Sequence, residues 1–154
     1  MIDDGIKNIN AAIQVSDKGY PLPIELRPLW RLGIMCLCIK VLGTTAHGLN
    51  VNKLRVATWM LNRPQLWDEY YKSMSSEQVK LPTINIDSNT DKAIELGMAK
   101  SFFSFSGDNV SLLETGNELL SLCDELNTFS KENDFLNTIK SKFTSSYINK
   151  IMGW

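Results

Sequence analysis

A chain of 154 residues is long enough for one domain, and a domain of that size buries about 70% of its unfolded surface. Its 16 basic and 17 acidic residues leave a formal charge of −1, so the chain as a whole attracts neither nucleic acid nor an acidic membrane surface. The opening residues, MIDDGIKNIN, lack the basic-then-apolar order of a signal peptide, and the three cysteines suggest reduced thiols. Together these features predict a cytoplasmic protein.

The first elements are two predicted helices on either side of a proline-rich connector. An amphipathic helix is predicted over 1–19 by four isoleucines at helical spacing, Ile2, Ile6, Ile9 and Ile13. The connector YPLPIELRP (20–28) should be extended and should end where Pro28 takes the first position of the next helix. That helix, over 29–42, contains the most hydrophobic run of the chain. The run is too short to span a bilayer and predicts a buried core helix.

The middle of the chain predicts further helices. After a break at 43–48, Asn50 is placed to cap a helix over 51–62, and Pro64 begins another helix. The pattern at 79–86 contains a proline, which allows only an edge strand or a turn. A further helix should begin at 87 or 88 and end at 99.

A β-hairpin and two more helices complete the predicted elements. The apolar runs SFFSF (101–105) and NVSLL (109–113) flank Gly-Asp-Asn, residues that tolerate the turn of a hairpin. A helix over 114–126 follows. One last helix is predicted from four apolar or aromatic side chains spaced by four, Phe135, Ile139, Phe143 and Tyr147.

The order of these elements predicts a mostly α-helical protein with a small β-hairpin, an α+β fold. It is typical of a winged helix-turn-helix domain, which would occupy 20–127 with the wing at 101–113. The helix at 1–19 would precede this core. The C-terminal helix, within 128–154, would pack on the core or on a partner.

The predicted winged domain has an unusual charge on the face that such domains present to DNA. A DNA-binding winged helix places its third helix in the major groove and its wing on phosphates, and both need Arg and Lys. Here Lys92 and Lys100 on the third helix are offset by three acids on the same helix, Asp87, Asp91 and Glu95. The predicted wing carries an aspartate and no basic residue. The side chains best placed to contact a DNA backbone are Arg55 and Arg63, on the second helix.

The residue types offer little to an enzyme. His47 is the only histidine and lies in an ordinary turn between helices, while Cys36 and Cys38 are two apart on a helix and point to different sides. We therefore expect no enzymatic activity and no cofactor. The alternative is a metal-dependent enzyme whose divalent-cation site is formed by Asp87, Asp91 and Glu95.

Aromatic side chains are more numerous than one small core requires. Such side chains anchor protein interfaces when they lie at the surface. We interpret Trp30 and Trp59 as core residues. A partner interface is predicted for six others, Trp67, Tyr70, Tyr71, Phe143, Tyr147 and Trp154.

Three segments carry a family resemblance: RPLWRLGIMCLCIKVLG, VNKLRVATWMLNRPQLWDEYY and IDSNTDKAIELGMAKSFFSFSGDNVSLLETGNELL. In pattern and order they resemble the small middle component of ABC-three-component systems, the Lamassu-type bacterial defence operons, over roughly 25–127. One departure is that Leu112-Leu113 stands where such domains often have Leu-Thr before the last helix, which removes a hydroxyl cap.

The resemblance implies a winged-helix accessory subunit that bridges an SMC- or Rad50-like ATPase and an effector nuclease in defence against phage or plasmid DNA. Its partners would be those two subunits, it would meet DNA mainly through the complex, and it would not bind a membrane. The alternative from another functional class is a winged-helix transcriptional regulator that binds DNA itself.

Overall fold

The computed structural model describes residues 27–75, 80–86 and 88–153. The helix predicted over 1–19, Asp87 and Trp154 lie outside these residues. The described part is mostly helical with one small antiparallel sheet, so the predicted α+β class is confirmed. Its elements in chain order are α2 (Pro28–Leu42), β1 (Leu49–Asn50), α3 (Val51–Leu61), η2 (Pro64–Leu66), α4 (Trp67–Ser75), α5 (Ser88–Ala99), β2 (Phe103–Ser106), β3 (Asn109–Leu112), α6 (Glu114–Glu125), α7 (Ser130–Ile139) and α8 (Ser145–Met152).

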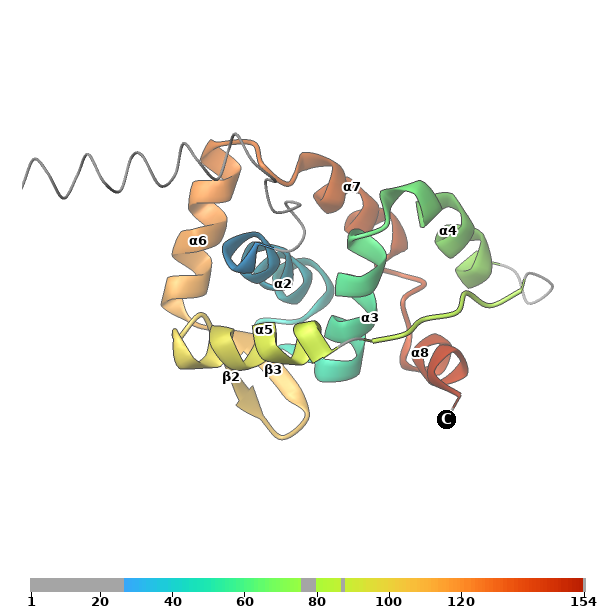
Figure 1. The fold of residues 1–154 in the computed structure, drawn as a ribbon, viewed down its shortest axis with the longest axis horizontal. Coiled ribbons are helices and arrows are strands. Elements are labelled where there is room, and N and C mark those ends of the chain that lie inside the picture. Colours follow the sequence, from blue (N-terminus) through green and yellow to red (C-terminus); the bar gives the residue numbers. More distant parts are fainter. Residues whose placement is uncertain (1–26, 76–79, 87, 154) are drawn as a thin grey trace, which may run out of the picture.

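Helix α2 lies at the centre of the fold (Figure 1). Every residue from 31 to 39 is buried, so this stretch has no face toward solvent. A helix that is apolar on all sides must be covered on all sides. Helices α3, α5, α6 and α7, together with β1 and β3, supply that cover. The prediction of a buried core helix is confirmed, and Pro28 stands in its first turn.

The sheet has three strands in the order β1-β3-β2. The predicted hairpin is confirmed as β2 and β3, with Phe103 opposite Leu112. The sequence pattern does not predict β1, which is two residues long and pairs with β3. Gly48 precedes β1 with a φ of 68°, and a Cβ there would overlap the backbone of Val110. Only glycine permits this close approach of the two strands.

Asn50 joins the sheet to α3. It is the last residue of β1, and its Oδ1 accepts a hydrogen bond from the Asn52 amide at 2.9 Å, which confirms the predicted cap. The amide of Val51, the first residue of α3, donates a hydrogen bond to the Asp108 carbonyl in the hairpin turn at 2.8 Å. The first turn of α3 is therefore bonded to the hairpin.

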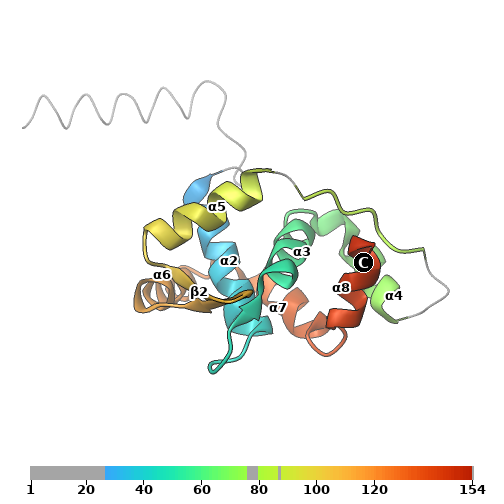
Figure 2. The same cartoon turned by 90° about the horizontal axis from the view of Figure 1, so that it is seen from below.

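The connection between α3 and α5 is much longer than the turn of a simple helix-turn-helix, which has about three or four residues. Residues 64–75 form η2 and α4 instead. Residues 80–86 contain no strand, so of the two alternatives for this segment, an edge strand or a turn, the edge strand is wrong for these residues. Figure 2 shows α4 beside α8, on the side of α3 away from α6. Helix α4 thus adds to the lobe on one side of the core that also contains α7 and α8.

The C-terminal region forms two helices where the sequence pattern predicts one, so that prediction is wrong. Helix α7 ends at Ile139 and α8 begins at Ser145, with the Thr144 hydroxyl accepting a hydrogen bond from the Tyr147 amide at 3.2 Å. This side-chain cap starts a new helix in a new direction. The four-residue spacing still marks inward side chains, because all four are buried: Phe135, Ile139, Phe143 and Tyr147.

Gly97 permits the close packing of α5 on β2, and its replacement tests that contact. A Cβ at Gly97 would overlap the ring of Phe103, which is buried and cannot move aside. Gly97→Ala should therefore lower the free energy of unfolding by about 1–3 kcal/mol, measured by urea denaturation followed by circular dichroism.

Gly107→Ala is the matched control for this substitution. Gly107 has a φ of 62° and open space around the added Cβ, so only backbone strain of about 1 kcal/mol is expected. A Gly97→Ala protein at least as stable as wild type would contradict the packing described for this contact.

Candidate protein interface

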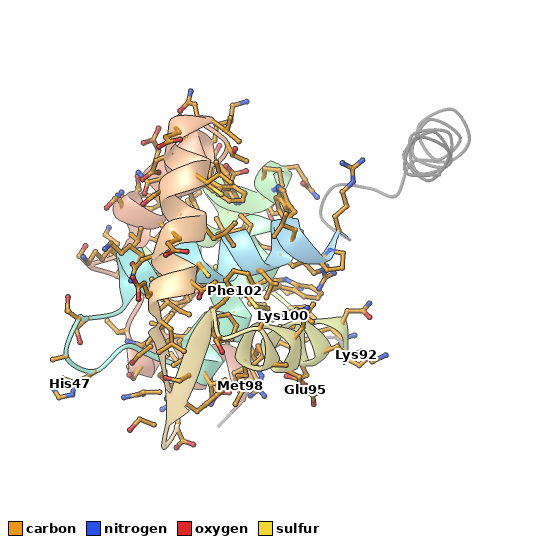
Figure 3. The ribbon with its side chains drawn as sticks, turned by 90° about the vertical axis from the view of Figure 1, so that its left-hand side faces the viewer. His47, Lys92, Glu95, Met98, Lys100 and Phe102 are labelled. Atoms are coloured by element: carbon orange, nitrogen blue, oxygen red, sulfur yellow. The ribbon has the colours of Figure 1, made fainter. Side chains whose placement is uncertain are left out.

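The face formed by α5 and the hairpin carries charges of both signs. Asp91, Lys92 and Glu95 are exposed along α5, and Lys100 is exposed just beyond its end. Figure 3 shows Lys92 and Glu95 on α5 and places Met98 and Lys100 nearer its C-terminal end. At the hairpin turn, Asp108 is the only charged residue and is also exposed. This face does not form a positive surface for a phosphate backbone.

Arg55 is held by α5. Its Nε donates to Asp91 Oδ1 at 3.0 Å, its Nη2 lies 3.0 Å from the same oxygen, and its Nη1 donates to Asn52 Oδ1 at 3.1 Å. The pair is partly exposed, with 31% and 52% of the two side chains accessible, so screening by water and salt keeps its contribution to stability small. Its main effect is to offset the charge of Arg55.

Arg63 follows the C-terminal end of α3 and is held against that helix. Its guanidinium carbon lies 3.3 Å from the centre of the Trp59 ring, and Nη1 donates to the Trp59 carbonyl at 3.0 Å. This cation–π contact and hydrogen bond fix the side chain against α3. Both arginines predicted to contact DNA are therefore engaged within the chain.

Trp67, predicted as an interface residue, packs inside the protein. Its ring stacks on Phe135 of α7, with centroids 4.6 Å apart and planes 10° from parallel. Its Nε1 donates to the Met60 carbonyl at 2.8 Å. Trp67 thus links α4 to α3 and α7.

Three further predicted interface residues lie in the core: Tyr70, Phe143 and Tyr147 are exposed by 2%, 4% and 7%. The Tyr147 hydroxyl shares a hydrogen bond with the buried Ser73 hydroxyl, which also donates to the Tyr70 carbonyl at 2.7 Å. Burial raises the pKa of Tyr70 and of Tyr147. This burial corrects their assignment to a partner surface, because a side chain that fills the core of its own chain cannot anchor a partner.

Tyr71 is the predicted interface residue that the structure leaves accessible, with 37% of its surface exposed. Lys142 covers part of it: the ammonium lies 4.8 Å from the ring centre and donates to the Ser75 hydroxyl at 2.9 Å. Trp154 lies outside the described residues. Of the five described residues in this set, Tyr71 is exposed, Trp67 is partly buried, and the other three are buried.

The remaining candidate residues do not come together. His47 is exposed in the turn after α2, well apart from Lys92 and Glu95 (Figure 3). Cys36 and Cys38 are buried in α2, and burial raises the pKa of Cys36 to about 12 and that of Cys38 further. Within the described residues no group of three or more His, Cys, Asp or Glu side chains is arranged to hold a metal ion.

The largest exposed apolar feature on one helix is a stripe along α6, which we call the leucine stripe. Leu122 and Leu126 are 52% and 69% exposed, and Leu119 is partly exposed. With Thr115 they follow spacings of four, three and four, which puts them on one side of the helix. Gly116 and Leu120 point to the core instead. The spacing of the leucines and the spacing of Gly116 and Leu120 already separate an outer face of this helix from an inner one in the sequence.

Acidic side chains border the leucine stripe. Glu114, Glu118 and Glu125 are all exposed, and spacings of four and seven place them on a neighbouring side of the helix, which we call the glutamate stripe. The segment 114–126 contains no Lys or Arg. The outer surface of α6 is thus apolar beside acidic, a pattern suited to protein contact and unsuited to DNA.

Comparison of the chain with known protein families, with curated proteins and with solved structures yields no match. No helix in the described part has the length and apolar character needed to cross a membrane.

Tyr70 and Tyr71 are adjacent in sequence but should behave differently when truncated. Tyr70→Ala removes a ring from the core and should lower the free energy of unfolding by about 3–5 kcal/mol. Tyr71→Ala removes a half-covered surface ring and should lower it by less than about 1 kcal/mol. Urea denaturation of the two variants beside wild type measures both values. Equal losses for the two substitutions would show that the burial of Tyr70 is wrong.

Proposed function

We propose that this chain is a non-catalytic accessory subunit that acts through protein contacts, bridging an SMC- or Rad50-like ATPase and an effector nuclease in defence against phage or plasmid DNA. The identity of these partners rests on the resemblance of 25–127 to the middle component of Lamassu-type systems. A winged-helix arrangement of α2, β1, α3, α5 and the hairpin is part of the proposal.

The observation that carries the proposal is the mixed charge of the described face where a winged helix would bind DNA, on which the exposed Lys92 and Lys100 lie among the exposed Asp91 and Glu95. Arg55 is bonded to Asp91, Arg63 lies on the Trp59 ring, and the hairpin has no basic residue. Non-specific DNA affinity depends on neutralising several phosphates at once, and two engaged arginines cannot replace that set. The exposed leucine stripe of α6 supplies the apolar area that a protein contact needs.

The regulator alternative requires DNA affinity of the isolated chain, which a binding experiment can measure. A fluorescent duplex titrated with the full-length protein at physiological salt should bind no more tightly than about 10⁻⁵ M. The Arg55→Ala, Arg63→Ala double variant should change that affinity by less than about threefold, since neither guanidinium is free to bind a phosphate. Sub-micromolar binding that the double variant abolishes would favour the regulator.

The subunit proposal itself is tested by co-expression with the ATPase gene of the same operon. The tagged full-length chain should retain the ATPase through size-exclusion chromatography at both low and moderate salt. An untagged chain expressed beside the same ATPase is the control for adhesion to the resin. Elution of the chain as a free monomer, with the ATPase absent from its fractions at both salts, would rule out the proposal.

A further inference from the structure

We propose that the outer surface of α6, its leucine stripe together with its glutamate stripe, is the docking site for a basic amphipathic helix of a partner protein. This inference rests on the proposed function, because it gives a location to the protein contacts that a bridging subunit must make. It names the surface and the chemistry of what binds there.

The leucine stripe gives the site its length and its apolar character. From Leu119 to Leu126 the three leucines span about two helical turns, or roughly 10 Å, and Thr115 continues the same side of the helix by one polar residue. Leu122 and Leu126 present more than half of their surface to water, although leucine side chains of a small domain are normally drawn into its core. An apolar stripe of this length matches the contact face of another helix, which presents side chains at the same spacings.

The glutamate stripe specifies the charge of that helix. Glu114, Glu118 and Glu125 form no ion pair with the residues that the structure describes. Since 114–126 holds no Lys or Arg, the negative potential along this edge is not offset on the helix itself. A partner helix with Lys or Arg beside its apolar stripe complements both features and would be steered to the site by charge.

Two other occupants fit less well. A second copy of the chain would bring one glutamate stripe toward another at the same surface, and like charges brought together oppose association. The isoleucine pattern at 2–13 of this chain is apolar at helical spacing, but Asp3 and Asp4 outnumber Lys7 there. Neither occupant supplies the positive charge that the edge of α6 lacks.

The test measures the binding of two fluorescein-labelled peptides to the full-length chain by fluorescence anisotropy. Each peptide has about 18 residues, or roughly five helical turns, with a leucine stripe on an alanine background. One carries lysines beside the leucines, and the other carries glutamates at the same positions. The lysine peptide should bind at least about tenfold more tightly than the glutamate peptide.

Three variants locate the site. Leu122→Glu with Leu126→Glu should weaken binding of the lysine peptide by at least about tenfold. Leu81→Glu, a matched change at a leucine that is 38% exposed in the segment between α4 and α5, should leave binding unchanged. Figure 1 shows that segment on the opposite side of the molecule from α6. Glu118→Lys with Glu125→Lys should reverse the preference between the two peptides, which non-specific adhesion to an apolar surface would not do.

Several results would overturn the inference. Equal binding of both peptides, or equal loss in the Leu81→Glu control, would remove the specificity on which it depends. A wild-type dimer that dissociates on Leu122→Glu with Leu126→Glu would make the occupant a second copy. A tenfold gain in affinity, about 1.4 kcal/mol, on Ile6→Asp with Ile9→Asp would make it the segment 2–13.

Co-expression with the ATPase separates failure of this inference from failure of the proposed function. An ATPase complex that persists in the Leu122→Glu, Leu126→Glu protein would place the contact elsewhere and leave the proposed function standing. A wild-type chain that never retains the ATPase, yet distinguishes the two peptides at α6, would refute the proposed function and keep the docking site.

Discussion

The complete burial of residues 31–39 in α2 is the constraint on which the rest of the structure depends. A helical segment without a solvent-facing side would expose apolar side chains to water if any neighbour were missing. Helices α3, α5, α6 and α7 and the sheet therefore all pack against it. Each of these elements packs one face against α2, and its opposite face is left for other contacts. For α6 the remaining face is the one that carries the exposed leucines and glutamates.

The lobe formed by α4, α7 and α8 uses most of its aromatic residues for internal packing. Trp67 stacks on Phe135, and the buried hydroxyls of Ser73 and Tyr147 share a hydrogen bond between α4 and α8. A buried tyrosine is stable only when its hydroxyl has such a partner. The aromatic side chains therefore join segments that are distant in sequence, and they are structural in this chain.

The sequence predicts local structure well where one residue determines it. Asn50 has the side chain that an N-cap needs, Pro28 suits the first turn of a helix, and the apolar run of α2 has no polar side to expose. These features belong to single elements, so they can be inferred without knowing the neighbours. The α+β class follows from their order.

What the sequence does not predict depends on contacts between distant segments. Strand β1 is defined only by its pairing with β3, and its two residues form no pattern of their own. The four-residue spacing from Phe135 to Tyr147 fits one helix as well as two, because it marks inward side chains and not the direction of the axis. For the candidate site, the sequence does not distinguish Tyr70 from its neighbour Tyr71, although Tyr70 is buried and Tyr71 is accessible.

The hydrogen bond between the hairpin turn and the start of α3 couples the position of the hairpin to that of the helix. The Val51 amide is held by the Asp108 carbonyl, and Asn50, which caps α3, is itself paired with Asn109. A displacement of the turn is therefore transmitted to the first turn of α3, where no flexible loop lies between them to absorb it. Arg55 of that helix also pairs with Asp91 of α5, but this pair is partly exposed, so α5 is held to α3 more weakly. The hairpin turn and the first turn of α3 should therefore move together as one unit.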